Sequence, residues 1–473
     1  MAEQPIVAIA GATGFVGRAL ACSLAPHYRV IGLARVPPPP TPQAPVQWRR
    51  CDLFSLLQCE AALQGVEHAF YLVHSMLPSA HLTQGSFRDM DLICADNFAR
   101  AAAKAGVRQI IYLGGLIPAK TALSEHLSSR LEVEQTLGSR GVPVTALRAS
   151  IVIGPGGSSY RMFCVLVERL PVIPCPVWAK SLTQPVALDD VLALLRYCIE
   201  HPAQENRSFD IGSPDVMSYR ELLERTARLL GLKRRFFNVP VSGSFWCRRW
   251  LSWVTGAPKA LAAPLAESIR HSMVCRDRRL QAEAGVKGVP FDAAVRATAA
   301  REKAMKRAGF PLASLRARAR ALYQFDVRSV QRLVLPPGRS ALWAAEQYSA
   351  FLPRFFRVLL RADVDYRRNV RFRLPLTRTS LVELTFAHDR NGDPSRQLFY
   401  ITGGLLVRKV NRPSGRPRLE FREALGGKLL LIGIHDYRPT LPWPVYNCTQ
   451  ALVHLWAMRG FGRYLASLAP PGE

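Results

Sequence analysis

Residues 6–17 read IVAIAGATGFVG, a strand-like run followed by three glycines at a spacing of three. The five apolar residues at 6–10 are typical of a buried parallel strand. Gly11 permits a tight turn, Gly14 lets the backbone approach a pyrophosphate, and Gly17 allows close packing of the next helix, whose N-terminus favours negative charge. The stretch predicts a dinucleotide-phosphate site, with a purely structural glycine turn as the alternative. Its expected contacts are Gly11, Thr13, Gly14, Phe15, Val16 and Gly17.

Strand-like and helix-like segments alternate from this turn onward. We expect strands at 6–10, 29–34, 68–73, 109–114 and 143–153, and helices at 18–24, 91–105 and 124–138. Strands alternating with helices of this length indicate a doubly wound parallel sheet, that is, an α/β Rossmann architecture. From about residue 155 to 325 helices dominate, at 188–199 and 218–230, with Ser218 as an N-cap. We interpret that stretch as a substrate lobe within an NAD(P)-binding domain of residues 1–325. A basic helical connector is expected at 295–335, across the end of this domain.

The pattern changes type at about residue 340, where we place a second, smaller α+β domain, 340–473. Antiparallel strands are expected at 370–374, 380–388, 397–410, 418–423 and 428–436, and a long helix at 446–468. Pro353 is expected to shorten any helix around 351–360. The last helix has an apolar face at helical spacing, namely Ala451, Leu452, Leu455, Met458, Phe461 and Leu465.

Composition and charge narrow the classes of function. The chain has 473 residues, 49% of them hydrophobic, and a formal net charge of +28, of which residues 1–150, 151–330 and 331–473 carry +3, +13 and +12. No apolar run is long enough for a membrane-spanning helix, and the first residues lack the features of a signal peptide, so we expect a cytoplasmic protein. Ten cysteines without CxxC spacing indicate free thiols and no metal site. The basic surface favours an anionic membrane or ligand over nucleic acid.

The GxxGxxG spacing resembles the extended and atypical short-chain dehydrogenase/reductase superfamily, most closely its NmrA-like and epimerase-like branch. Further stretches at 51–53 (CDL), 71–76 (YLVHSM) and 148–154 follow in the order of that family. Over residues 5–310 the resemblance implies an NAD(P) cofactor held on the glycine turn. It implies an adenine contact at Asp52 with Leu53, and further cofactor contacts at Leu72, Val73, His74, Asn97, Ile151 and Ile153.

Arg35 ends the second expected strand, where an acidic residue would accept hydrogen bonds from the adenine ribose and favour NAD. A guanidinium can instead pair with a 2′-phosphate, so Arg35 favours NADP, with NAD possible. The alternative is an arginine that is merely exposed before the proline-rich loop.

The resemblance also implies a serine, a tyrosine and a lysine as the catalytic set, and this sequence departs from it. His126 occupies the tyrosine position, Arg130 the lysine position, and the strand end at 112–116 offers no serine. His126 could donate a proton, because its reference pKa lies near the working pH. Arg130 could hold the nicotinamide ribose, and Tyr112 is a second candidate donor. Alternatively these residues are helix-surface residues or ligand contacts, and catalysis is lost.

Two functions therefore stay open. The first is an NADP-dependent oxidoreductase that acts on a bulky apolar or anionic, lipid- or quinone-like molecule, with peripheral contact to an anionic membrane. The second is a non-catalytic NAD(P)H-binding redox sensor or assembly factor. The last domain resembles a helix-grip domain, which implies a space for an apolar ligand between its sheet and last helix; ordinary core packing is the alternative.

Overall fold

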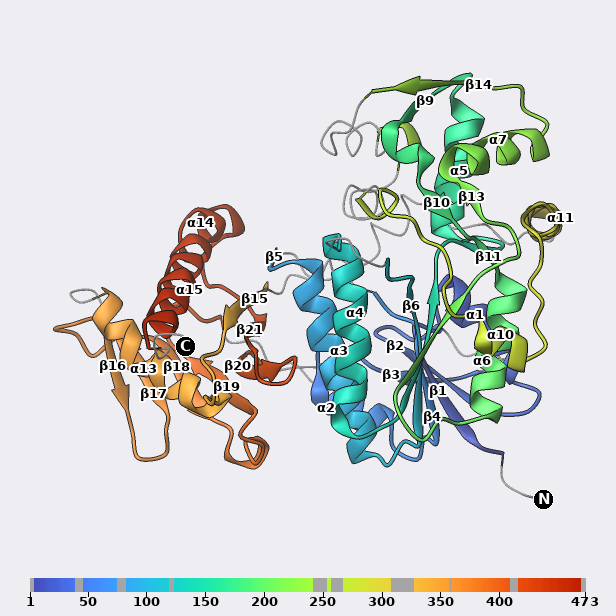
Figure 1. Cartoon of the computed structure of the whole chain (residues 1–473). Coiled ribbons are helices and arrows are strands. Elements are labelled where there is room, and N and C mark those ends of the chain that lie inside the picture. Colours follow the sequence, from blue (N-terminus) through green and yellow to red (C-terminus); the bar gives the residue numbers. More distant parts are fainter. Residues whose placement is uncertain are drawn as a thin grey trace. The chain divides into compact units, whose positions relative to one another are not determined.

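The computed structural model describes residues 4–38, 46–74, 82–118, 123–240, 253–256, 267–307, 327–356, 360–408 and 416–468 (Figure 1). The chain divides into two compact units. The first comprises Met1–Leu77 with Asp91–Ala321, and the second comprises Pro78–Met90 with Leu322–Glu473.

A seven-stranded parallel sheet forms the centre of the first unit. Val7 and Ile9 pack in the core on one face of the sheet, whereas Ala8 and Ala10 pack on the other. Burial on both faces explains why this strand is apolar at every position. In sheet order the strands are β12 (Arg207–Ile211), β7 (Val144–Ala149), β6 (Gln109–Gly115), β4 (His68–Tyr71), β1 (Ile6–Ala10), β2 (Arg29–Ala34) and β3 (Gln47–Arg50).

Helices cover both faces of this sheet, as Figure 1 shows for α3 and α4 on one side and α6 and α10 on the other. The doubly wound α/β fold is therefore confirmed. The helices of the first layer are α2 (Leu56–Ala62), α3 (Phe87–Lys104) and α4 (Glu125–Leu137). Those of the second layer are α1 (Phe15–Leu24), α6 (Leu188–Glu200) and α10 (Arg279–Glu283).

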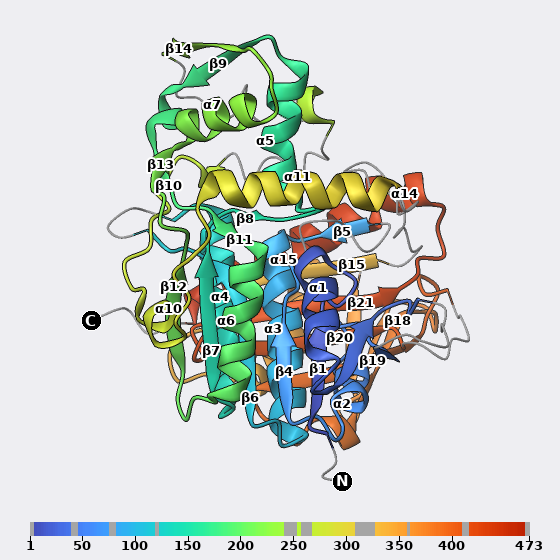
Figure 2. The same ribbon diagram turned by 90° about the vertical axis from the view of Figure 1, so that its right-hand side faces the viewer.

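The lobe that follows β7 has its own small core, which includes Tyr219, Leu222 and Phe291. Figure 2 shows α11 running across the direction of the sheet strands, beneath α5 and α7. The helices are α5 (Ser158–Arg169), α7 (Tyr219–Leu229) and α11 (Phe291–Arg307). Three two-stranded ladders join them: β8 (Val152–Ile153) with β11 (Val186–Ala187), β9 (Val172–Pro176) with β14 (Arg235–Val239), and β10 (Leu182–Thr183) with β13 (Met217–Ser218).

Of two predictions for the lobe and the strand that leads into it, one is confirmed and the other is wrong. Ser218 is the N-cap of α7, and its side chain accepts a hydrogen bond from Glu221 N at 3.1 Å, as predicted. The single strand expected at 143–153 is instead two strands, because β7 ends at Ala149 and β8 starts at Val152. At the break, the Ser150 hydroxyl accepts a hydrogen bond from Ile151 N at 2.5 Å, a bond that competes with the strand ladder.

The second unit is an eight-stranded sheet packed against two long helices, α13 (Ala341–Phe356) and α15 (Gln450–Ser467). All neighbouring strands are antiparallel except β15 and β5, which are parallel. In sheet order the strands are β16 (Arg361–Val364), β17 (Val370–Arg373), β18 (Ser380–Phe386), β19 (Arg396–Gly403), β20 (Arg418–Ala424), β21 (Leu429–Tyr437), β15 (Val327–Val334) and β5 (Leu82–Gln84). A short helix, α14 (Trp443–Cys448), precedes α15.

The division of the chain differs from the expected 1–325 and 340–473. Residues 78–90 belong to the second unit, and the longer segment of that unit begins at Leu322. The expected basic helical connector is wrong at its end, because Val327–Val334 is the strand β15. This strand lies between β21 and β5, and Arg332 forms an ion pair with Asp89 at 2.7 Å within the same unit. Partners that are distant in sequence override the helical pattern here.

Two helices of the second unit also differ from expectation. Helix α13 continues through Pro353, since buried Tyr348, Phe351 and Leu352 anchor it in the core despite the amide that the proline removes. On α15, Leu452 is 56% exposed, whereas Met458 and Phe461 pack in the core between sheet and helix. None of the helices in the described part of the chain has the length and apolar character needed to cross a membrane.

Candidate functional site

The turn after β1 brings the backbone unusually close to the end of β4. Gly11 has φ +90°, and a Cβ atom there would lie 2.7 Å from the carbonyl oxygen of Leu72. A Cβ atom on Gly17 would collide with the Gly11 carbonyl, so α1 packs against the turn only with glycine at 17. Gly14 is the N-cap of α1, and no side chain caps this helix. The amides of the first turn, from Phe15 to Gly17, are thereby left for an anionic ligand, with Thr13 exposed beside them.

The pairing of β2, β1 and β4 places several predicted cofactor residues at one edge of the sheet. Ala10 is in register with Leu33 and with Tyr71, and Leu72 N donates a hydrogen bond to Ala10 O at 2.9 Å. Arg35, directly after β2, and the stretch Leu72, Val73 and His74, directly after β4, therefore lie at the same carboxyl end as Gly11. The strand order changes direction between β1 and β4, which is where ligands bind in such sheets.

The loop after β3 is held by a buried amide. Asn97 on α3 is fully buried, and its Nδ2 donates a hydrogen bond to Leu53 O at 2.8 Å. The Asp52 carboxylate accepts a hydrogen bond from Phe54 N at 3.2 Å within the same loop. The structure thus gives Asn97, expected as a cofactor contact, the role of positioning the loop that carries Asp52 and Leu53.

A cavity of about 220 Å³ lies at the carboxyl ends of β6 and β7. Of the predicted residues it is lined by His74, His126, Arg130 and Ile151, whereas Tyr112 and Ile153 lie elsewhere in the core. The apolar lining comes from Leu113, Leu127, Ala149, Val152, Met162, Phe163, Ile269 and Met273, and polar groups come from Ser150, Ser158, Ser159, Tyr219 and Ser268.

Arg130 is a buried guanidinium paired with a buried carboxylate. Its Nη2 lies 2.5 Å from Asp91 Oδ2 on α3, and Ser129 Oγ donates a hydrogen bond to the same oxygen at 3.2 Å. Within the described residues, the Nε atom of Arg130 is buried and donates to no protein acceptor. Asp91 thereby fixes the guanidinium and offsets its charge, while the Nε donor remains for a ligand.

His126 is one helical turn before Arg130 on α4. Burial, together with the nearby charges of Arg130 and His74, lowers the pKa of His126 to about 3. The imidazole is therefore neutral at neutral pH, in contrast to the expectation of a pKa near the working pH. A neutral imidazole can donate a hydrogen bond to a carbonyl oxygen but does not carry the extra proton of an imidazolium.

Tyr112, the second candidate donor, is enclosed in the core of the sheet. Its hydroxyl donates a hydrogen bond to Arg130 O at 3.3 Å, and burial raises its pKa to about 12. Tyr112 supports the backbone of α4 and does not reach the cavity, because its side chain points into the layer under α3 and α4. Its position within an apolar strand does not indicate which face of the sheet the side chain takes.

Several lining residues were not expected from the sequence. Tyr219, the first residue of α7, is buried and stacks on Phe163 of α5 at 6.0 Å between ring centroids. Burial raises its pKa to about 12. Ile269 and Met273 come from a segment more than a hundred residues after β7, so no local pattern could assign them to this site. Within the part of the chain that the structure describes, no three His, Cys, Asp or Glu side chains gather as metal ligands would.

Comparison with known proteins agrees with this geometry. Residues 7–212 match the model of the NAD dependent epimerase/dehydratase family. "Auxiliary protein GraX" of Staphylococcus aureus is 33% identical over 144 residues, which are 30% of this chain and 43% of that protein, so the match spans less than half of its length. The ceramide reductase of Caulobacter vibrioides is 26% identical over 245 residues, 50% of this chain and 74% of that protein.

Among solved structures, a nucleoside-diphosphate-sugar epimerase from Staphylococcus aureus has a TM-score of 0.50 at 15% sequence identity. The superposed region covers 61% of this chain and 99% of the epimerase chain. At this identity the likeness concerns the fold. Together with the glycine turn and the strand order, these matches confirm the Rossmann fold and the resemblance that the motifs indicated, since residues 7–212 are similar to the NAD dependent epimerase/dehydratase family.

Proposed function

We propose that this chain is an NADP(H)-dependent oxidoreductase that reduces the carbonyl group of an apolar substrate in the His126–Arg130 cavity. One observation carries the proposal. The glycine turn after β1 and the cavity at the ends of β6 and β7 open at the same edge of one parallel sheet. A dinucleotide whose pyrophosphate lies on the turn would extend along that edge toward His126.

The residues present fit a dinucleotide. Gly11 and Gly17 hold the turn so close to β4 and α1 that a side chain at either position would collide with the backbone. The uncapped N-terminus of α1 suits the pyrophosphate, and the guanidinium of Arg35 suits a 2′-phosphate. When bound in reduced form, this cofactor supplies the hydride for the carbonyl carbon.

The side chains of the cavity would bind and polarise the substrate. Arg130, fixed by Asp91, would use its Nε donor to hold a ribose hydroxyl or the substrate oxygen. Neutral His126 would donate a hydrogen bond to the carbonyl oxygen as negative charge develops there. The proton that completes the alcohol would then come from water, because His126 carries no spare proton at neutral pH.

The lining supports an apolar substrate more than an anionic one. Met162, Phe163 and Ile269 contribute apolar surface, whereas the charge of Arg130 is already offset by Asp91. The ceramide reductase of Caulobacter is by its name a reductase of a lipid, which is consistent with an apolar substrate here. The cavity of about 220 Å³ is smaller than the ~300 Å³ from which ligand pockets usually start, so a bulky substrate would extend beyond it.

A non-catalytic NAD(P)H sensor is the second candidate, and a specific observation favours it. Among the described residues that line the cavity no lysine accompanies Tyr219, and the lowered pKa of His126 leaves the imidazole without a spare proton at neutral pH. Such a protein would bind the cofactor through the same turn and would use the cavity to report its redox state.

We further infer peripheral contact with an anionic membrane through α15. Leu452, Val453 and Trp456 on its outer face are 56%, 47% and 53% exposed, and Arg459 and Arg463 lie on the same helix. No acidic residue occurs from Gln450 to Ser467. Exposed apolar side chains beside arginines are typical of helices that lie in the membrane interface.

Two measurements on the purified chain separate the enzyme from the sensor. Titration with NADPH and NADH tests the cofactor, and oxidation of NADPH with a panel of long-chain ketones, aldehydes and quinones tests turnover. We expect turnover to be lost in His126→Ala and retained in His27→Ala, a control histidine that is exposed near the end of α1. NADPH binding without turnover of any compound would support the sensor.

A further inference from the structure

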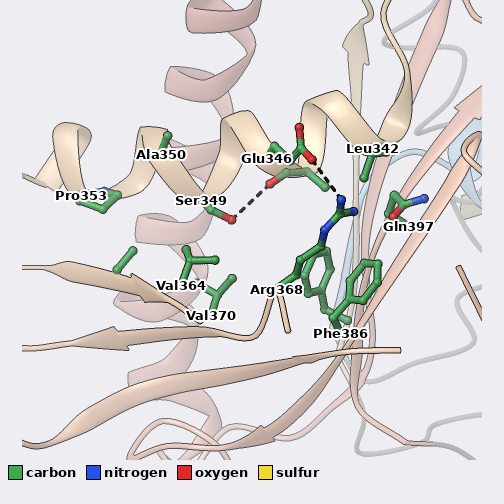
Figure 3. A pocket seen from close by; sticks show the side chains of 13 residues that line it. Leu342, Glu346, Ser349, Ala350, Pro353, Val364, Arg368, Val370, Phe386 and Gln397 are labelled. Atoms are coloured by element: carbon green, nitrogen blue, oxygen red, sulfur yellow. Dashed lines mark hydrogen bonds and ion pairs between the residues drawn. The ribbon is translucent and has the colours of Figure 1, made fainter. Parts of the chain in front are cut away.

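A second cavity, of about 440 Å³, lies between helix α13 and the strands β16–β19 of the second unit (Figure 3). Its volume falls within the range of about 300–1,000 Å³ that is usual for small-molecule sites. The resemblance to a helix-grip domain implied a space beside the last helix instead. In the structure α15 packs into the core, and the open space lies under α13.

Small side chains on one stripe of α13 create this space. The stripe follows the helical repeat through Ala345, Ser349 and Pro353, and it faces a buried apolar floor. Three strands supply that floor with Val370, Phe386 and Phe399, which are 2%, 8% and 5% exposed. Protein interiors are close-packed, so a cavity between a stripe of small residues and a largely apolar floor indicates room for a ligand.

The two ends of the cavity differ in polarity, as Figure 3 shows. Val364 and Val370 lie beneath Ser349 at one end, whereas Glu346, Arg368 and Gln397 gather at the other. An adjoining hollow of about 390 Å³ shares Leu342, Arg368, Phe386 and Gln397 with the cavity, and its described lining adds Tyr366, His388 and Asn391 but no carboxylate.

Arg368 is placed at this polar end by its backbone and by its neighbours. It lies in the β16–β17 turn with φ +62°, a conformation that non-glycine residues rarely adopt. Its guanidinium lies 5.6 Å from the centre of the Phe386 ring. Nη2 is 3.9 Å from Glu346 Oε1, and both side chains are about half exposed, at 51% and 55%. An exposed pair at this distance is weak, so an anion can replace Glu346 as the partner of Arg368.

We propose that this cavity binds a single-chain amphiphile, with its apolar chain between α13 and the sheet and its carboxylate or phosphate head at Arg368. The apolar floor recognises the chain, and the fork of the guanidinium recognises the oxygens of the head. The site lies wholly within the second unit and does not depend on the function proposed for the first.

The location of the site is tested on the full chain with 11-(dansylamino)undecanoic acid, whose fluorescence rises in apolar surroundings. Ser349→Leu fills the cavity from α13, and we expect it to abolish probe binding while leaving the melting temperature unchanged or higher. Ser139→Leu, at an exposed serine of the first unit that lines neither cavity, is expected to bind the probe like the unaltered chain. Unaltered binding by Ser349→Leu, or no binding by the unaltered chain, overturns the proposal.

The head group is tested by competition with dodecanoate, dodecyl phosphate and dodecanol. Arg368→Asn keeps a residue that tolerates the turn, and we expect it to weaken both anions by about three- to tenfold, since Arg368 is half exposed, and to leave dodecanol unchanged. Arg378→Asn, an exposed arginine that lines neither hollow, serves as the control. Equal losses for the anions and dodecanol, or inhibition by inorganic phosphate alone, would overturn the assignment of the head to Arg368.

Discussion

Arg130 Nη2 lies 2.5 Å from Asp91 Oδ2, and both side chains are almost completely buried, at 7% and 1% exposure. The pair joins α4, which carries His126, to α3 under the carboxyl edge of the parallel sheet. The carboxylate of Asp91 thus holds the guanidinium of Arg130 in place beside the cavity. The pair therefore links the stability of the first unit to the geometry of the proposed active site.

Asp91→Asn should lower the free energy of unfolding by about 3–5 kcal/mol, because it leaves the Arg130 charge buried without its partner. Urea unfolding measures the loss. Asp189→Asn is the matched control, since its ion pair with Arg301 is half exposed and should be worth less than about 1 kcal/mol. Adding Arg130→Met to Asp91→Asn should restore much of the stability. Equal losses for Asp91→Asn and Asp189→Asn would contradict the burial of the pair.

Gly14→Val should abolish NADPH binding with little change in melting temperature. A Cβ atom at position 14 would lie 3.0 Å from the Gly11 carbonyl oxygen, which needs only a small adjustment, but the valine side chain would keep a pyrophosphate from the N-terminus of α1. Gly17→Val should instead destabilise the fold, since its Cβ meets the Gly11 backbone. Fluorescence titration and thermal unfolding separate the two effects. Full NADPH affinity in Gly14→Val would remove the phosphate site from this turn.

Arg35→Asp should weaken NADPH more than NADH, by roughly the 1.5–3 kcal/mol of a charge-assisted hydrogen bond. Arg29→Asp is the control, because Arg29 starts β2 and thus lies at the opposite edge of the sheet. Isothermal titration with both cofactors gives the difference directly. An equal loss for the two cofactors would show that Arg35 does not contact the 2′-phosphate.

His126 should make the protein less stable as the pH falls below about 6.5. Its pKa in the folded chain is about 3, against about 6.5 when unfolded, so the unfolded state binds a proton that the folded state does not. The contribution of neutral His126 to the free energy of unfolding is complete above pH 6.5. It is lost as the pH falls toward 3, at up to about 1.4 kcal/mol per pH unit. Urea unfolding of His126→Gln between pH 7 and 4.5 should therefore show a shallower pH dependence than the unaltered chain. Identical slopes would mean that His126 titrates normally.

Trp456→Ser should weaken co-sedimentation of the full chain with anionic vesicles. The basic residues near the surface of the bilayer act over the Debye length, which falls from about 10 Å at 0.1 M salt to 3 Å at 1 M, so binding should also decrease with salt. Neutral vesicles and Trp48→Phe, a substitution in the core of the first unit, are the controls. Binding that ignores both lipid charge and salt would exclude this membrane contact.

The first unit was largely predictable because its signals are local. An apolar run buried on both faces, three glycines at fixed spacing and helices of regular period each act within about ten residues, and β1 and β2 match their expected bounds. The spacing of His126 and Arg130 by one helical turn likewise follows from the sequence, as does their place beside the sheet edge.

Contacts between distant segments decided the rest. The sequence does not indicate that Asp91 pairs with Arg130 of α4, nor that Met273 lines the cavity beside that helix. Val327–Val334 is polar and basic enough to suggest a helix, yet it becomes a strand because β21 and β5 supply hydrogen-bond partners on both sides. Local signals are enough to predict the strand–turn–helix that can hold a dinucleotide. Only the tertiary structure decided that His126 is neutral and Tyr112 is enclosed, because burial and neighbouring charge depend on which surfaces the chain brings together.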